Sequence, residues 1–362
     1  MSETIPSEPI LVALSGGVDS SVAAALLLEQ GYRVEAAYMK NWINEENILG
    51  DCPWQEDIVA ARAAAGHLGI PFRVINLMDD YRERIVEYLL EGYRRGITPN
   101  PDVLCNREMK FGIFLDLALR EGYAGVATGH YARKVVTLPG AYGLALSADP
   151  RKDQTYFLAL LRQTQVAKGY FPLASLTKEQ VREKALAAEL PNARKKDSQG
   201  ICFIGNIRMR DFLRHYVPDD PGEIVNQEGR VLGEHPGLHL FTIGQRKGLG
   251  IPSNRDFEHY VVVGKDAESK RLIVAFDRPT SPGLYTDTVR VRELSWIDQP
   301  VEEPCSLLAR ARYLDPSTPI EFLPTGEGRA EIRFAVPQRA IAAGQIIALY
   351  RDDLLLGGAV YE

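Results

Sequence analysis

Residues 10–21 read ILVALSGGVDSS, an apolar run that meets two glycines, an aspartate and a pair of serines. The apolar run has the composition of a buried β-strand, and the Ala/Leu-rich stretch at 20–30 is typical of an α-helix. A glycine pair lets backbone N–H groups approach an anion, and the N-terminus of the next helix adds partial positive charge. The stretch therefore predicts a phosphate-binding turn, with a ligand-free glycine turn before a serine-capped helix as the alternative.

The glycine spacing of this turn narrows the class of nucleotide enzyme. It fits neither GxxxxGK[ST] nor GxGxxG, which argues against a P-loop NTPase and a standard dinucleotide dehydrogenase. The stretch resembles the SGGxDS PP-loop of ATP pyrophosphatases, enzymes that adenylate a carbonyl-type oxygen and release pyrophosphate. The resemblance implies that Ser20 and Ser21 help to cradle phosphates and that Asp19 helps to place Mg²⁺. The ATP-binding residues that it implies in and around the turn are Ala13, Leu14, Ser15, Gly16, Gly17, Val18, Asp19 and Ser20.

The pattern of apolar residues changes along the chain and predicts three domains. Strand-like and helical segments alternate up to about residue 205, which indicates an α/β domain with a Rossmann-like parallel sheet and helices on both faces. Within it, a helix is expected from Lys110 onward, after a loop. Short β segments rich in Gly and Pro follow, and then six runs with period-two alternation. We expect a catalytic domain at 1–205, a small central domain at 206–282 and a C-terminal antiparallel β-barrel at 283–362, with a sandwich as the alternative to the barrel.

Composition and charge restrict the location and the partners. The chain has 362 residues, 45% of them hydrophobic, and a net charge of −6, so it is not a generally cationic nucleic-acid coat. No apolar run approaches the roughly 20 residues that span a bilayer, and the start MSETIPSEPI does not match a secretory signal. We expect a cytoplasmic protein without a membrane partner.

Four dispersed cysteines and the absence of CxxC argue against a disulfide framework, a zinc ribbon and a thioredoxin-type site. Two of the cysteines lie in unusual stretches that we expect to be loops. These are TPNPDVLCNREMKF (98–111), which contains Cys105, and KKDSQGICFIG (195–205), which contains Cys202. Lysines and arginines nearby favour the thiolate and hence reactivity. A pair of buried, inert thiols is the alternative.

Together these segments resemble the bacterial tRNA-specific 2-thiouridylases over nearly the whole chain. The matching segments are SGGVDSSVAA, AAYMKNW, ITPNPDVLCNREMKFG, ATGHYA, KDQTYFL, DSQGICFIG, GLHLFTIGQRKGLGI and RARY. The chain departs from the family at Ala13, where glycine is usual, and in the acidic loop INEENILGDC. The resemblance implies ATP-dependent 2-thiolation of the wobble uridine of tRNA, with a cysteine desulfurase or a sulfur-relay protein as donor. It also implies that backbone near Met39 and Gly129 lines the adenine and ribose pocket.

The expected chemistry assigns a role to each cysteine. The C2 oxygen of uracil is a poor leaving group, so ATP must first adenylate it. A persulfide on Cys202 then supplies sulfur, either by direct attack or as released sulfide, and the remaining S–S linkage must be broken by a second thiol. Cys105 is the candidate for that thiol, and a Cys105–Cys202 disulfide is left after turnover. Asp102 is the candidate general base, or the group that orients the thiol and the base.

Recognition of the RNA is expected from loops and strand ends, because anticodon-loop bases are read when they are splayed out. Two basic pairs, Arg290 with Arg292 and Arg310 with Arg312, share strand faces, although solvated strand faces are the alternative. For His130, a buried core histidine is the alternative. The residues assigned to tRNA or its target base are Asn100, Pro101, Asp102, His130, Lys152, Asp153, Gln154, Arg312, Tyr313 and Gln345.

Other functions stay open at this point. Cys52, Cys105 and Cys202 could ligate an iron–sulfur cluster, although we expect no metal because Cys52 lies in the acidic loop. An amide-forming PP-loop ligase would need neither the cysteine pair nor an RNA-binding face. A nucleotide-gated tRNA-binding protein would bind ATP without releasing AMP.

Overall fold

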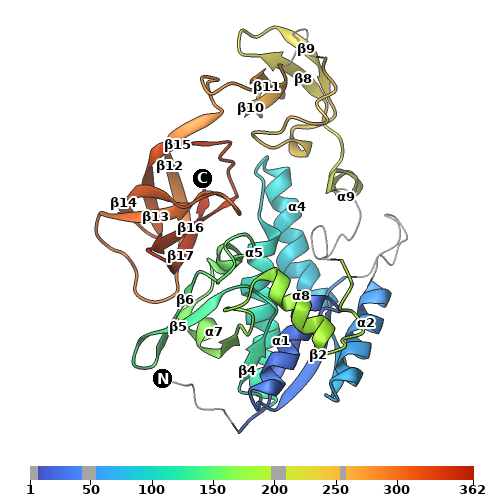
Figure 1. Ribbon diagram of the computed structural model, residues 1–362. Coiled ribbons are helices and arrows are strands. Elements are labelled where there is room, and N and C mark those ends of the chain that lie inside the picture. The colour runs from blue at the N-terminus through green and yellow to red at the C-terminus, as the bar shows by residue number, and fades with distance from the viewer. Residues whose placement is uncertain (1–6, 43–53, 197–208, 253–257) are drawn as a thin grey trace.

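The computed structural model describes residues 7–42, 54–196, 209–252 and 258–362. In Figure 1 the α/β domain lies at the bottom, the C-terminal barrel at the left and the central domain at the top. The three-part α/β, central and barrel architecture expected from the sequence is confirmed. The boundaries at 205 and 282 stay predictions.

A five-stranded parallel sheet, in the order β3-β2-β1-β4-β7, forms the centre of the first domain. Strand β1 is buried along its whole length and pairs with β2 on one side and β4 on the other. The chain runs outward from β1 through β2 and β3 and then returns to the other side of β1 as β4. Ligands of open α/β sheets bind at the carboxyl ends of strands at such a switch point, which here lies between β1 and β4. The strands are β1 (Ile10–Ala13), β2 (Val34–Lys40), β3 (Phe72–Asn76), β4 (Gly125–Ala127) and β7 (Gly169–Tyr170).

Helices pack against both faces of this sheet, as the alternation of patterns predicts. Small side chains let α1 and α2 approach closely, and Ala24, Ala61, Ala64 and Ala65 are buried in their contact with the sheet. The helices are α1 (Val18–Glu29), α2 (Trp54–His67), α3 (Met78–Tyr81), α4 (Glu87–Arg94), α5 (Pro101–Cys105), α6 (Phe114–Arg120), α7 (Gln163–Lys168) and α8 (Lys178–Ala187). Two π-helical segments, η1 (Arg82–Val86) and η2 (Asn106–Ile113), and a 3₁₀ turn, η3 (Thr155–Leu158), complete the set.

The loop expected before Lys110 is largely helical, and that expectation was wrong. Helix α5 begins at Pro101 because Asn100 caps it: the Val103 backbone N–H donates to the Asn100 side-chain oxygen at 3.2 Å. The π-helical segment η2 follows directly, so Cys105 ends a short helix instead of lying on a loop.

The central domain has one helix and a four-stranded sheet in the order β10-β11-β8-β9. Strands β8 and β11 pair in parallel, and the other two pairings are antiparallel. A 3₁₀ turn, η4 (Leu238–Leu240), lies next to helix α4 of the first domain. The remaining elements are α9 (Met209–Tyr216), β8 (Gly222–Asn226), β9 (Val231–His235), β10 (Tyr260–Asp266) and β11 (Arg271–Phe276).

The C-terminal strands form a closed antiparallel barrel in the order β12-β15-β14-β13-β16-β17, and pairing of β12 with β17 closes it. This decides between the barrel and the sandwich. The sequence patterns did not predict that a hairpin of the first domain, β5 (Arg133–Leu138) and β6 (Ala141–Ala145), extends the barrel sheet by pairing with β17. The barrel strands are β12 (Tyr285–Trp296), β13 (Cys305–Arg310), β14 (Thr318–Gly326), β15 (Arg329–Arg339), β16 (Ile346–Arg351) and β17 (Leu354–Tyr361).

Among the described residues, no helix is both long enough and apolar enough to cross a bilayer.

Candidate active site

The turn after β1 has the geometry of an anion-binding site. Gly16 has φ +78°, and a Cβ there would lie 2.3 Å from the Asp57 carbonyl oxygen, so no other residue fits without moving the backbone. Gly17 is the N-cap of α1 and provides no side chain to cap the first turn. The N–H groups at the start of α1 therefore lack a side-chain acceptor, and the helix dipole favours an anion at this end.

The serines of the turn fall into two groups. Ser15 is exposed, whereas Ser20 and Ser21 are buried. The Ser20 hydroxyl accepts from the Ser15 backbone N–H at 3.2 Å and donates to the Gly17 carbonyl at 3.1 Å, and the Ser21 hydroxyl donates to the same carbonyl. In this structure the hydroxyls of Ser20 and Ser21 hold the turn together, and the exposed Ser15 hydroxyl lies 3.1 Å from the Ser20 hydroxyl and accepts from the Gly17 N–H at 3.4 Å.

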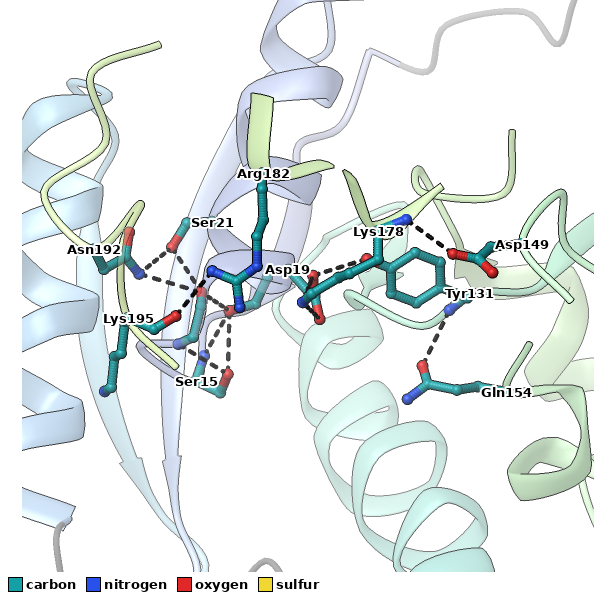
Figure 2. A network of polar contacts seen from close by, with 12 residues as sticks. Ser15, Asp19, Ser21, Tyr131, Asp149, Gln154, Lys178, Arg182, Asn192 and Lys195 are labelled. Atoms are coloured by element: carbon teal, nitrogen blue, oxygen red, sulfur yellow. Dashed lines mark hydrogen bonds and ion pairs between the residues drawn. The ribbon is translucent and has the colours of Figure 1, made fainter. Parts of the chain in front are cut away.

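Asp19 is bound on one side by a lysine that the sequence analysis did not single out. The Lys178 ammonium donates to both Asp19 carboxylate oxygens, at 2.7 and 2.9 Å, and the Tyr131 hydroxyl donates to one of them at 2.9 Å (Figure 2). Lys178 is the first residue of α8, which Thr177 caps through a capping box with Gln180. The lysine is buried beside the glycine turn, so solvent screens its charge only weakly.

The Mg²⁺ role expected of Asp19 stays a prediction. Both of its oxygens are already hydrogen-bonded to an ammonium group. Within the ranges that the structure describes, no group of three or more His, Cys, Asp or Glu side chains could hold a metal ion. Mg²⁺ prefers octahedral oxygen ligands and keeps several waters. A Mg²⁺ ion held by one or two carboxylates and by substrate phosphates needs no such group, so Asp19 remains the candidate.

Asn192 fastens the turn from the opposite side. Its side-chain amide nitrogen lies 3.0 Å from the Gly16 carbonyl, 3.2 Å from the Gly17 carbonyl and 2.9 Å from the Ser21 hydroxyl (Figure 2). Its side-chain oxygen is buried and has no hydrogen-bond partner among the residues that the structure describes. Three residues later, the Lys195 ammonium forms an ion pair with Asp57 at 2.6 Å. The chain then enters 197–208, so Cys202 lies outside the described residues, as does Cys52.

The segment after β4 connects the phosphate turn to the region of the buried cysteine. A Cβ on Gly129 would lie 2.8 Å from backbone atoms of Asp19 and Ser20, so this glycine permits close contact with the turn. The next residue, His130, is buried, and its Nδ1 lies 2.7 Å from the Thr128 hydroxyl. Burial, with a smaller effect of the Lys110 charge, holds the pKa of His130 well below its ordinary value, so this ring is neutral at pH 7.

Lys110 also acts on the candidate general base. Burial raises the pKa of Asp102 above its ordinary value, and the Lys110 ammonium opposes that rise. Lys110 donates to the Asn106 side-chain oxygen at 2.9 Å, which fixes the ammonium over the π-helical segment η2. Cys105 is 3% exposed and packs among the apolar residues of the core. The Lys110 charge thus acts on both Asp102, which lies on the same helix α5 as Cys105, and His130, which lies in the segment after β4.

Several residues assigned to tRNA lie where the first domain meets the barrel. The Tyr313 ring packs on Phe157 with 4.3 Å between ring centroids, and the charge of Lys152 affects the pKa of Tyr313. The Arg312 guanidinium is paired with Asp315 at 3.0 Å. This group of side chains therefore spans both domains on one side of the junction.

Other residues of that set are engaged inside the protein. Asp153 is 1% exposed and forms a 2.6 Å ion pair with Arg310, so Arg310 is neutralised in the interior and forms no solvated stripe with Arg312. Gln154 exchanges hydrogen bonds with the Tyr131 backbone through its N–H and its side-chain oxygen. The Gln345 side-chain nitrogen donates to the carbonyls of Thr98 and Pro99, at 2.8 and 3.1 Å.

The other residues expected to bind the nucleotide lie near the switch point between β1 and β4. Met39 is half-buried near the carboxyl end of β2, and Ala13, Leu14 and Val18 form the buried floor beneath the turn. Sequence reasoning missed Lys178 and Tyr131, which contact Asp19, and Asn192, which contacts the glycine turn. The pattern SLTKEQ contains a capping-box signal that predicts the start of α8 at Lys178, but nothing local indicates that this start lies against the glycine turn.

Three family models match consecutive parts of the chain. They are described as tRNA methyl transferase HUP domain over residues 8–206, tRNA methyl transferase PRC-barrel domain over 210–276 and aminomethyltransferase β-barrel domain over 286–361. A solved structure described as a 4-thiouridine synthetase–RNA complex with bound ATP is 18% identical, with a TM-score of 0.37, and covers 55% of this chain and 45% of that one. That likeness is too slight to bear on function.

Curated relatives match over the full length. The tRNA-specific 2-thiouridylase MnmA of Akkermansia muciniphila is 56% identical over 355 residues, which covers 98% of this chain and 98% of that protein. The protein of the same name from Halalkalibacterium halodurans is 43% identical and covers 98% of this chain and 94% of its own length. The chain belongs to the tRNA-specific 2-thiouridylase family.

Proposed function

We propose that this protein is a tRNA-uridine 2-sulfurtransferase that uses ATP to thiolate the wobble uridine of tRNA. One observation carries the proposal. The segment at 128–131 contacts the glycine turn through Gly129 and Tyr131, and the centroid of the His130 ring lies 6.2 Å from that of Phe111 in η2, the segment that follows Cys105. This proximity supports a single site for an activating nucleotide and a reactive thiol. The names of the full-length relatives support the same activity.

In the first step of this proposal, the turn holds the phosphates of ATP with the N–H groups at the start of α1. Lys178 and the helix dipole supply positive charge next to them. The C2 oxygen of the uridine attacks the α-phosphate, the bond to the β-phosphate breaks, and pyrophosphate leaves. Adenylation turns the C2 oxygen into part of a good leaving group, AMP. A sulfur nucleophile can therefore attack C2.

In the second step, a persulfide on Cys202, loaded by a cysteine desulfurase or a sulfur-relay protein, attacks C2 and AMP leaves. The base is then bound through two sulfurs to Cys202. The Cys105 thiolate attacks the Cys202 sulfur, the S–S bond to the base breaks, and its electron pair stays on the thiolated uridine. A Cys105–Cys202 disulfide remains and is reduced by an external thiol. Asp102 accepts a proton in its carboxylate form or orients the reacting groups.

One experiment separates this activity from its rivals. Purified protein is incubated with ATP, a persulfide donor and unmodified tRNA, and the digested nucleosides are analysed by mass spectrometry. Thiolated uridine with stoichiometric AMP supports the proposal. An amide-forming ligase would give AMP without any need for RNA, and a nucleotide-gated binding protein would give no AMP.

Substitution of each cysteine tests its assignment. Cys202→Ser and Cys105→Ser should each abolish turnover and leave tRNA binding within about threefold of wild type. Cys305→Ser is the matched control, because Cys305 is a half-buried cysteine in barrel strand β13. Retained turnover in Cys202→Ser would contradict the persulfide role.

An iron–sulfur cluster would occupy the thiols that the persulfide route needs. Visible absorbance of anaerobically purified protein, lost in Cys105→Ser, would replace the persulfide mechanism with a cluster-based one. We further propose that the protein acts in the cytoplasm, where tRNA and thiol reductants are available. We also propose that the chain divides into its three domains at residues 205 and 282.

A further inference from the structure

The segment that leads into α5 is held by the other two domains. It begins at Gly96, just after α4, and ends at Asn100, the cap of α5. From the central domain, the Lys265 ammonium donates to the Gly96 carbonyl at 3.1 Å and the Thr242 hydroxyl lies 3.2 Å from the Thr98 hydroxyl. From the barrel, the Ala343 carbonyl accepts from the Thr98 backbone N–H at 2.9 Å.

The strongest of these ties is Gln345. Its amide nitrogen has two protons, and it lies 2.8 Å from the Thr98 carbonyl and 3.1 Å from the Pro99 carbonyl. Pro99 has no N–H, so this stretch cannot continue a helical ladder and its carbonyls must be satisfied from outside. The neighbouring Gly344 has φ +87°, and a Cβ there would lie 3.1 Å from the Thr98 carbonyl group, so the two backbones touch at this point.

The backbone of Gln345 is itself fixed to the barrel. Its N–H donates to the Ala342 carbonyl, and its carbonyl accepts from the Tyr361 N–H at 2.9 Å. The following residue, Ile346, accepts a 2.9 Å hydrogen bond from the Tyr156 hydroxyl of the first domain. Gln345 therefore connects a rigid strand of the barrel to the backbone that begins the helix with Asp102 and Cys105.

This use of Gln345 limits what it can offer to RNA. Both amide protons are directed to protein carbonyls, so the side chain retains acceptor capacity only. A tRNA phosphate also offers only acceptor oxygens, so it cannot form a hydrogen bond with the remaining acceptor of Gln345. The amide that family resemblance assigns to tRNA is thus occupied in holding Thr98 and Pro99.

We propose that Gln345 is a positioning residue, through which the barrel sets the placement of α5 and hence of Asp102 and Cys105. This inference rests on the proposed thiolation and names a residue that acts on the same site. Helix α5 has only five residues and ends at Cys105. A displacement of its N-terminal cap, Asn100, should therefore move Cys105 by a similar distance. Misplacement of reacting groups by about 1 Å can lower a rate by about a hundredfold.

The test separates rate from RNA binding. Gln345→Met keeps the length of the side chain and removes both donors, and Gln345→Glu also places a carboxylate against the two carbonyls. Gln338→Met is the control, because Gln338 is a barrel glutamine that donates within its own strand, to the Val336 carbonyl. Single-turnover thiolation at saturating tRNA and ATP is compared with the equilibrium Kd for tRNA, and hydrogen exchange of the 98–105 amides is followed in the free protein.

The expected result for Gln345→Met is a rate at saturation at least about tenfold lower, a tRNA Kd within about threefold and faster exchange at 98–105. Gln338→Met should match wild type. A tenfold weaker Kd with an unchanged rate at saturation would make Gln345 an RNA contact and overturn the proposal, as would unchanged rate and exchange. If wild type thiolates no tRNA, the proposed function fails, whereas the exchange data still decide whether Gln345 holds the segment.

Discussion

The Lys178 ammonium and the Asp19 carboxylate form a two-point ion pair at 2.7 and 2.9 Å, although 159 positions separate them in the chain. The pair lies at the mouth of the glycine turn, with Lys178 nearly buried. Asp19 thereby orients a cation toward the site of the phosphates and does not stand alone as an acidic group. Without the lysine, the Asp19 carboxylate would keep only the Tyr131 hydroxyl as partner among the described residues and would carry an uncompensated negative charge beside the glycine turn.

We expect Lys178→Met to weaken ATP binding by at least tenfold and to leave tRNA affinity within about threefold, because only the nucleotide approaches this pair. Calorimetric titration with ATP measures the effect. Lys184→Met is the control, because Lys184 lies on the same helix and pairs with Glu29 at the surface. The double variant with Asp19→Asn should recover part of the affinity, since the leftover negative charge is removed. An unchanged ATP affinity in Lys178→Met would show that the pair is only structural.

We expect Gly129→Ala to lose most ATP binding. Its Cβ would lie 2.8 Å from the backbone of Asp19 and Ser20, which is closer than real contacts allow, so the turn must move. Gly66→Ala is the matched control, because no atom lies within 4 Å of a Cβ at that helical position. That control should bind ATP normally and gain up to about 1 kcal/mol in stability. Equal ATP affinity in the two variants would remove Gly129 from the site.

We expect Lys110→Met to shift the acidic limb of the thiolation rate toward higher pH. Burial already raises the pKa of Asp102, and the Lys110 charge opposes that rise, so removing the charge raises the pKa further. The carboxylate form then appears only at higher pH. Single-turnover rates measured across a pH series provide the test, with Lys168→Met, an exposed lysine, as control. If the limb stays in place, Asp102 does not act as a carboxylate in the rate-limiting step.

We expect Arg310→Met to destabilise the protein by about 3–5 kcal/mol, because it leaves the buried Asp153 carboxylate without its cation. Urea denaturation followed by circular dichroism measures the loss. The double variant with Asp153→Asn should be more stable than the single one. Glu179→Gln breaks the exposed pair with Arg151 and should leave the denaturation midpoint unchanged. A comparable shift in both single variants would contradict the importance of burial.

We expect Lys265→Met to change the pH dependence of stability. Burial lowers the pKa of Lys265 to about 8, below its ordinary value of 10.5. Between these values the unfolded chain binds more protons, so the contribution of this lysine to stability rises with pH. The stability of wild type relative to Lys265→Met should therefore increase from pH 7 to pH 10, by on the order of 3 kcal/mol at most. Lys270→Met, a surface lysine paired with Asp220, should show no such trend.

Much of the architecture follows from local patterns in the chain. The glycine turn, the alternation of strands and helices, and the period-two runs near the C-terminus predicted the parallel sheet and the barrel. These features rest on backbone conformation and on one-sided burial, both of which repeat over a few residues. The helix at 101–105 was missed because Pro and Asn usually signal a turn, although here they form its cap and first residue.

The contacts that define the site could not be read from such patterns. Lys178 meets Asp19, Asn192 fastens the glycine turn, Gln345 holds Pro99, and a hairpin at 133–145 extends the barrel sheet. Each of these contacts joins segments far apart in the chain, and its partner depends on how whole elements pack. Residue types and short spacings thus predicted a nucleotide-binding turn and a reactive thiol. Packing of distant elements, both within the first domain and between domains, determined which charges, carbonyls and donors surround them, because those pairings form only when distant backbones are brought together.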